Sequence, residues 1–382
     1  MRHLIPLLCC CVCLPSLALA SDAGFTSWEP HRTGRFDQTI TGLRAGILKR
    51  VQRCIGGKEW VAEEQLADQT LVPYDSTLQI VVPETYQPDR PHGIVIYISP
   101  GNNKGLPKTI RRHLADQQLI GAAFSNAGNK VRTVIRQTLA VQTGRLLKEH
   151  YTIDPMRVYI TGYSGGGRVA STTMLMWAYE FSGGFPMGGA NPCEPMLFVD
   201  GKNKTYETRG RWRRPDEKLL EYARQYGRYV FIAGEKCFNR RQCEMICEGY
   251  QKIGYQHVAF RMIPGVGHKA APADLVLESL ETLDRPLSDW CETNLEDAKQ
   301  HMDEESYLQA FRCARAARMS AADETLRQQA AALEAEARPL AEGAGEEALA
   351  KVDTEADRRN FIRRWSGLAV ADTARQALQG GP

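Results

Sequence analysis

The sequence carries little excess charge of either sign, and this limits its possible partners. Among its 382 residues, 48 are lysine or arginine and 45 are aspartate or glutamate, so the formal net charge is only +3. A nucleic-acid-binding domain usually shows a clear basic excess, which is missing here. Hydrophobic residues make up 43% and charged residues 24%, as in ordinary globular proteins. We therefore expect a folded protein that binds no nucleic acid.

Long hydrophobic runs are also scarce, and the one marked run lies at the N-terminus. Residues 4–19 are mostly apolar, but the run is too short, and too interrupted by Pro15, for a membrane span of about 20 residues. It ends in Ala18-Leu19-Ala20, a small-x-small pattern typical of a cleavage site. Residues 1–20 are therefore predicted to be a signal peptide cleaved after Ala20. We expect a secreted or periplasmic protein without a transmembrane segment.

Seven of the eleven cysteines lie beyond the predicted signal peptide. They are Cys54, Cys193, Cys237, Cys243, Cys247, Cys291 and Cys313. An oxidising compartment favours disulfides among them, and Cys291 with Cys313, or Cys193 with Cys237 or Cys243, are the pairings considered. A metal site would need another close ligand pair beside Cys243 and Cys247, and none is evident. We expect no metal and no other cofactor.

Residues 73–285 alternate strand patterns with helix patterns. Continuous apolar runs at 93–98 and 119–124 end in polar turns that contain glycine, which is typical of strands buried on both faces of a sheet. Further strands are predicted at 157–161, 229–233 and 257–263, with helical patterns between them. This order predicts an α/β domain with a mainly parallel sheet. Residues 21–72 are weakly patterned and form an N-terminal segment.

Residues 286–382 show no strand pattern. Alanines and charges dominate 314–350, where apolar residues recur at helical spacing. A second helical face is formed by Phe361, Ile362, Trp365 and Leu368. We predict an all-helical C-terminal region with a break at Pro339 and Gly343. This region is a candidate surface for a protein partner.

The segment Gly162-Tyr163-Ser164-Gly165-Gly166 contains Gly-x-Ser-x-Gly between a predicted strand and a predicted helix. A nucleophilic serine must protrude from a sharp strand-to-helix turn, where side chains two positions away would collide. The pattern therefore predicts Ser164 as a nucleophile. The amide of Gly165, at the start of the helix, is expected to stabilise an oxyanion. A purely structural glycine-rich turn is the alternative.

His268 is the predicted catalytic base. It lies in Pro264-Gly265-Val266-Gly267-His268, on a loop after the last clear strand. A serine followed later in the chain by such a histidine agrees with the order that the Gly-x-Ser-x-Gly motif requires. The alternative is a loop histidine that caps the next helix.

These motifs resemble those of a known family. Ile153-Asp154-Pro155, Gly162 to Gly166 and Pro264 to His268 are similar to secreted α/β-hydrolase esterases related to polyhydroxybutyrate depolymerase and feruloyl esterase. The resemblance covers residues 83–268, about half of the chain. It implies an α/β-hydrolase fold and hydrolysis of a small-molecule or polymer ester through an acyl-enzyme. Ser164 would be the nucleophile, and His268 the general base and acid.

The third member of the expected triad departs from the family pattern. In Gly-Glu-x-Asp-Phe-Asn-Arg the aspartate falls where this sequence has Cys237. A neutral thiol cannot stabilise an imidazolium as a carboxylate does. Three possibilities follow: Glu235 supplies the carboxylate, another acid such as Asp274 reaches His268, or the site is impaired and the domain binds rather than cleaves. Glu235 is taken as the tentative acid.

The second oxyanion amide is expected in the turn after the strand 93–98. Pro100 has no N–H, so Gly101 or Asn102 is the candidate donor, and a simple polar turn is the alternative. The basic run 209–215 could bind an acidic or aromatic substrate, although a solvated loop is the simpler interpretation. Asn203-Lys204-Thr205 is a glycosylation sequon.

Overall fold

The computed structural model describes most of the chain beyond residue 24. The described residues are 25–26, 28–55, 71–102, 105–199, 205–208, 215–321 and 323–379. The predicted signal peptide, Asn203 and the basic run up to Arg214 lie outside these ranges, so their interpretations stay predictions. The chain divides into two compact units, one of residues Ala20–Asp284 and one that includes Arg285–Pro382. No helix among the described residues is both long and apolar enough to cross a membrane.

The first unit alternates strands and helices over most of its length. Its elements are β1 (Gly34–Arg44), α1 (Ala45–Ile55), β2 (Leu71–Val82), β3 (His92–Ile98), α2 (Lys108–Arg111), β4 (Leu119–Phe124), α3 (Thr133–His150), β5 (Ile153–Tyr163), α4 (Gly165–Met176), β6 (Gly183–Met187), β7 (Met196–Val199), β8 (Thr205–Thr208), α5 (Glu217–Tyr226), β9 (Arg228–Gly234), α6 (Arg240–Lys252), β10 (His257–Ile263) and α7 (Ala273–Asp284).

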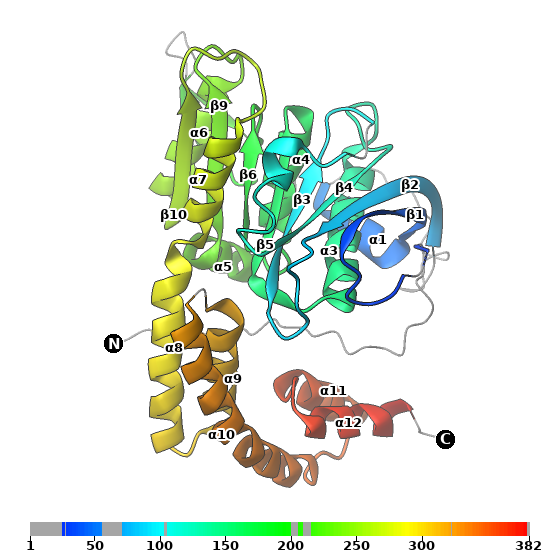
Figure 1. Cartoon of the computed structure of the whole chain (residues 1–382), viewed down its shortest axis with the longest axis vertical. Helices are drawn as coiled ribbons and strands as arrows, with labels where there is room; N and C mark the ends of the chain where they lie inside the picture. The colour runs from blue at the N-terminus through cyan, green and yellow to red at the C-terminus, as the bar shows by residue number, and fades with distance from the viewer. Residues whose placement is uncertain are drawn as a thin grey trace. The chain divides into compact units, whose positions relative to one another are not determined.

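Eight strands form one sheet in the order β1-β2-β4-β3-β5-β6-β9-β10 (Figure 1). Strand β2 pairs antiparallel with β1 and with β4, and the other neighbours pair parallel. The prediction of a mainly parallel α/β sheet is therefore confirmed. Strands β7 and β8 form a separate antiparallel pair.

Strand β1 comes from the N-terminal segment that sequence analysis set apart from the sheet. Its inward positions are Phe36, Gln38 and Ile40, all buried, and its outward positions are exposed. The glutamine in the middle of this inward row weakens the apolar alternation that would have revealed a strand. The segment is therefore part of the first unit and forms one edge of its sheet.

Both faces of the sheet are covered, as the apolar run of β3 shows. Ile94, Ile96 and Ile98 join a core formed with α1, α3, α4, α5 and α6, whereas Val95 and Tyr97 join a second core with α2 and α7. Successive side chains of a strand point to opposite faces, so a strand between two helical layers must be apolar throughout. Because the strands run parallel, their carboxyl ends meet at one edge of the sheet.

The second unit is helical, as predicted. It contains α8 (Pro286–Asp303), α9 (Tyr307–Ser320), α10 (Glu324–Leu349), α11 (Glu355–Arg364) and α12 (Ala369–Gln379). The predicted break at Pro339 is wrong, because α10 continues through it. A proline removes one main-chain hydrogen bond, but Ala337 and Ala341 on either side of it are fully buried and hold the helix in place.

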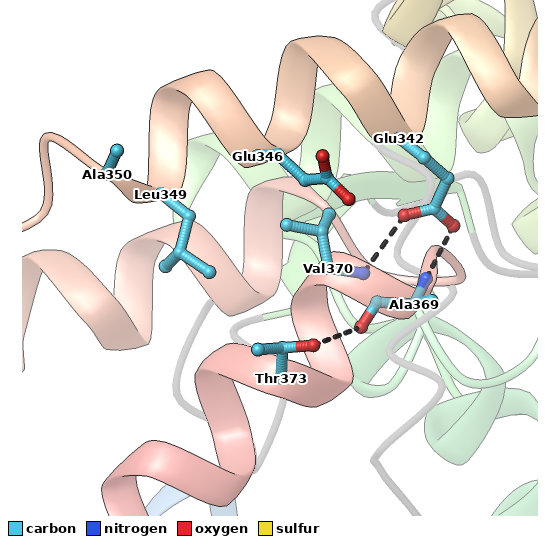
Figure 2. Close-up of a pocket in the computed structure, with 7 residues that line it drawn as sticks. All are labelled: Glu342, Glu346, Leu349, Ala350, Ala369, Val370 and Thr373. Carbon is cyan, nitrogen blue, oxygen red and sulfur yellow. Dashed lines mark hydrogen bonds between the residues drawn. The ribbon is translucent and has the colours of Figure 1, made fainter.

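Glu342 of α10 caps the start of α12. Its carboxylate accepts hydrogen bonds from the backbone N–H groups of Ala369, at 2.6 Å, and Val370, at 3.0 Å (Figure 2). These groups have no partners within the helix, and the negative charge is favourable at a helix N-terminus. A hollow of about 510 Å³ lies beside this cap and is lined by Glu342, Glu346, Leu349, Ala350, Ala369, Val370 and Thr373.

Replacing Glu342 by alanine is expected to weaken α12 by about 1 kcal/mol, since two N–H groups lose their acceptor. Hydrogen exchange of the α12 amides should then become about fivefold faster. Glu347→Ala, an exposed position on the same helix, serves as the control and should leave the exchange unchanged. Equal effects of the two substitutions would contradict the capping role.

Candidate active site

Ser164 occupies a sharp turn between β5 and α4. Its φ of 55° and ψ of −119° are unfavourable for a residue with a side chain. The turn is held by two backbone hydrogen bonds: the Ser164 N–H donates to the Met187 carbonyl at 2.8 Å, and the Ser164 carbonyl accepts from the Arg168 N–H at 3.1 Å. A side chain on Gly166 would overlap the Ile98 carbonyl, which explains that glycine of the motif.

The turn brings Ser164 to His268, which follows β10. The Oγ atom of Ser164 lies 2.9 Å from Nε2 of His268. The other ring nitrogen, Nδ1, lies 3.0 Å from the Sγ atom of Cys237, on the loop after β9. The loop backbone is fixed as well, because the Tyr163 hydroxyl donates to the His268 carbonyl at 2.7 Å. The side chains of Ser164, His268 and Cys237 therefore form one continuous hydrogen-bonded chain.

The sheet order, the serine turn after the central strand β5 and the histidine after the last strand β10 together identify the architecture. The first unit has an α/β-hydrolase fold. The fold predicted from the sequence, with its helical C-terminal region, is thus confirmed.

Two features lower the pKa of His268 below its ordinary value of 6.5. Partial burial is the larger cause, and the positive charge of Arg168 adds to it. The shift favours the uncharged imidazole. When the Ser164 hydroxyl donates to Nε2, the ring proton resides on Nδ1 and is directed at Cys237.

Cys237 occupies the position of the aspartate in the pattern that this loop resembles. Its side chain is buried, and its sulfur also lies 3.4 Å from the backbone N–H of Asn239. In the tautomer with its proton on Nδ1, two donors, the imidazole Nδ1–H and this N–H, thus converge on one sulfur atom. The surroundings would suit a carboxylate, but the residue supplies a thiol.

Arg168 and Asn239 hold this loop, and sequence analysis missed both. The guanidinium of Arg168 donates to the side-chain oxygens of Asn191 and Asn239, each at 2.9 Å. Asn239 in turn donates to the Gly188 carbonyl at 2.7 Å. Asn239 lies within the pattern quoted for this loop, and Arg168 directly follows the glycine-rich turn. Their positions beside the predicted site could therefore have indicated a role in it.

The structure does not bring Glu235, the tentative acid, to His268. Its exposed carboxylate accepts a hydrogen bond from the Gly265 N–H at 2.6 Å, and both ring nitrogens of His268 are already engaged by Ser164 and Cys237. Glu235 lies two residues before Cys237 on a turning chain, which directs it to the next loop instead. Asp274, the other acid considered, is exposed in the first turn of α7.

The predicted oxyanion donors have different surroundings. Gly165 is the first residue of α4, so its N–H is not used within the helix. The N–H of Gly101 donates to the Ser99 hydroxyl at 3.1 Å and is therefore engaged, which argues against the predicted role. The Asn102 side chain accepts from the Gly128 N–H at 3.0 Å and ties two loops together. The Asn129 carboxamide packs directly against Gly165.

The expected disulfides are not confirmed, because none of the seven described cysteines takes part in one. The Cys193 thiol donates to the Thr172 carbonyl at 3.7 Å, and the Cys291 thiol to the Ala317 carbonyl at 3.4 Å. Burial raises the pKa of Cys243 and of Cys247 to about 12. Such thiols behave as small apolar core residues.

Within the described ranges, no cluster of three or more histidine, cysteine, aspartate or glutamate side chains is placed to hold a metal ion.

No protein-family model matches this sequence, and no curated protein matches it. Similar solved structures include a thermostable esterase, with 16% identity and a TM-score of 0.38 over 55% of this chain and 57% of that one. Esterase 2 of Thermogutta terrifontis, phosphorylated by paraoxon, shows 14% identity and a TM-score of 0.40 over 56% and 89%. S-formylglutathione hydrolase (FrmB) of Staphylococcus aureus shows 12% identity and a TM-score of 0.42 over 56% and 94%. The chain thus spans little more than half of the first of these. Because these likenesses are weak, the site itself must carry any assignment of function.

Because Glu235 binds Gly265 and not His268, Glu235→Gln should change the rate of ester hydrolysis less than twofold. Steady-state kinetics with p-nitrophenyl acetate measure this, and Ser164→Ala supplies the inactive reference. A loss of 100-fold or more in Glu235→Gln would restore Glu235 as the acid.

Proposed function

We propose that this protein is a serine hydrolase that cleaves carboxylic esters, with Ser164 as the nucleophile and His268 as general base and acid. The 2.9 Å contact between Ser164 Oγ and His268 Nε2, made from a backbone turn of unfavourable φ, carries this proposal. A structural glycine-rich turn needs neither the strain nor the aligned histidine, so both features favour chemistry at Ser164.

The geometry supports a two-step reaction. In the first step Ser164 Oγ attacks the ester carbonyl carbon, its proton passes to His268 Nε2, and the carbonyl electron pair moves onto oxygen beside the Gly165 amide. The tetrahedral intermediate then collapses, its bond to the alcohol breaks, and Nε2 returns the proton to the leaving alcohol. Water repeats the sequence on the acyl-enzyme and releases the acid.

Cys237 performs part of the work of a triad acid. When its sulfur accepts a hydrogen bond from Nδ1–H, it favours the tautomer in which the unprotonated Nε2 faces Ser164. A neutral sulfur does not stabilise the imidazolium that forms during attack. In a serine protease, replacing the acid by a neutral residue lowers kcat about 10⁴-fold, which sets the scale of the deficit.

The thiol also favours a second candidate function, a hydrolase fold that binds its ligand without cleaving it. The observation behind this alternative is that Cys237 contacts His268 where a triad acid would, while Asn239 and Arg168 hold the loop in place. Activity in the wild-type protein decides between the two.

We also propose that the protein acts outside the cytosol on a small-molecule or polymer ester, with the helical unit as a surface for a protein partner. The pattern of residues 1–20 supports export. Phe238 supports an ester with an apolar group, because its side chain is 78% exposed and its ring centroid lies 4.3 Å from that of His268.

Wild-type protein is expected to hydrolyse p-nitrophenyl acetate and butyrate slowly, and Ser164→Ala to abolish the reaction. Cys237→Asp should raise kcat by roughly 10²–10⁴-fold, because an aspartate would stabilise the imidazolium. Cys237→Ser, which stays neutral, is the matched control and should gain nothing. Inert wild type together with active Cys237→Asp would favour the binding function, whereas Ser164→Ala with wild-type activity would refute the mechanism.

The value of kcat/KM should also fall at acidic pH, with its inflection at a low pH. A general base must be neutral, and the pKa of His268 is lowered, so the acid limb of the kcat/KM profile should have its inflection below pH 6.5. Arg168→Gln removes a positive charge that lowers this pKa, and the acid limb should therefore move to higher pH. A wild-type inflection above 6.5, or a shift to lower pH in Arg168→Gln, would contradict this.

A further inference from the structure

Arg136 of α3 is a buried cation whose side chain binds main-chain carbonyls. Its side chain is almost completely enclosed, with the residue 3% exposed. One terminal nitrogen donates to the Ser99 carbonyl at 2.9 Å, and the other to the Gly165 carbonyl at 3.3 Å. Its Nε–H is buried and has no hydrogen-bond partner among the described residues.

This arrangement is costly for stability. Among the described residues no carboxylate forms an ion pair with Arg136, and burial alone lowers its pKa to about 10. Removing a charge from water without an opposite charge beside it is strongly unfavourable. The two carbonyl hydrogen bonds offset only part of this penalty.

The two carbonyls belong to the two segments that meet at the serine turn. Ser99 follows β3, and its hydroxyl accepts the Gly101 N–H, so Arg136 fixes the start of this loop. Gly165 directly follows Ser164 and carries the predicted oxyanion amide. The guanidinium therefore joins the loop after β3 to the first turn of α4, at the peptide unit that directly follows Ser164.

We propose that Arg136 is a positioning residue that holds these two segments together and supplies a fixed positive charge to the oxyanion. This inference rests on the proposed function, since it assigns the charge to the intermediate formed by Ser164. A preorganised charge in a water-poor site stabilises developing negative charge without reorganisation. The ester substrate is neutral there, so the effect should fall on kcat and not on KM.

Arg228 provides a matched control. It is also a buried arginine, 1% exposed, and it donates to the main-chain carbonyls of Leu283 and Met156. It lies at the first residue of β9, at the opposite end of the strand from Cys237 and the histidine loop. Loss of Arg228 tests the cost of removing a buried guanidinium without touching the site.

The test compares Arg136→Lys, Arg136→Gln, Arg136→Met and Arg228→Met, each in the wild-type and Cys237→Asp backgrounds. The measurements are kcat and KM for p-nitrophenyl butyrate, and the inhibition constant of phenylboronic acid, which forms a negatively charged tetrahedral adduct with a nucleophilic serine. Rates are expressed per reactive serine, counted by complete labelling with a fluorophosphonate, so that unfolded protein does not enter the comparison.

Arg136→Met and Arg136→Gln are expected to lower kcat 10–100-fold with KM changed less than threefold, and to weaken the boronate in parallel. Arg136→Lys, which keeps the charge, should recover a large part of both losses, and Arg228→Met should leave kcat unchanged. Unchanged kcat and boronate affinity in Arg136→Gln, or the same losses in Arg228→Met, would overturn the inference while leaving the proposed function intact. If neither background hydrolyses esters faster than Ser164→Ala, the proposed function fails, and this inference fails with it.

Discussion

The turn at Ser164 is the constraint on which the rest of the site depends. A residue with a side chain is held at a φ of 55°, at a cost of about 1–3 kcal/mol, between the central strand β5 and the helix α4. The close approach of Gly166 to the Ile98 carbonyl and the bond from Ser164 to Met187 keep the chain there. The buried sheet thus supports a local conformation that no isolated pentapeptide would keep.

The electrostatics around His268 combine two effects that act in the same direction. The third position offers a thiol in place of a carboxylate, so His268 lacks the carboxylate that would stabilise a protonated imidazole. Arg168, which orders the same loop through Asn239, adds a positive charge that disfavours protonation further. His268 is therefore well placed to act as a base, but its protonated form is poorly stabilised. Any chemistry at Ser164 therefore depends more strongly on stabilisation of the oxyanion.

The fold and the serine–histidine contact could be predicted because both leave local patterns. Apolar runs mark strands buried on two faces, and the glycine spacing around Ser164 reflects a steric requirement of its own turn. The role of Glu235 could not be derived, since it depends on which way a short loop turns its side chains after β9. Arg136 was equally hidden, because an arginine in a helix is most often a solvent-exposed residue, and its burial follows only from packing against distant segments.

Strand β1 has a consequence for where this chain can be shortened. It pairs antiparallel with β2 along nearly its whole length and thereby occupies the hydrogen-bonding edge of that strand. A fragment starting near residue 73, where the sequence pattern of the sheet becomes clear, would leave the β2 edge open and uncover Leu78 and Ile80. Open apolar edges recruit strands from other molecules, so such a fragment is expected to aggregate more readily than the chain that keeps β1.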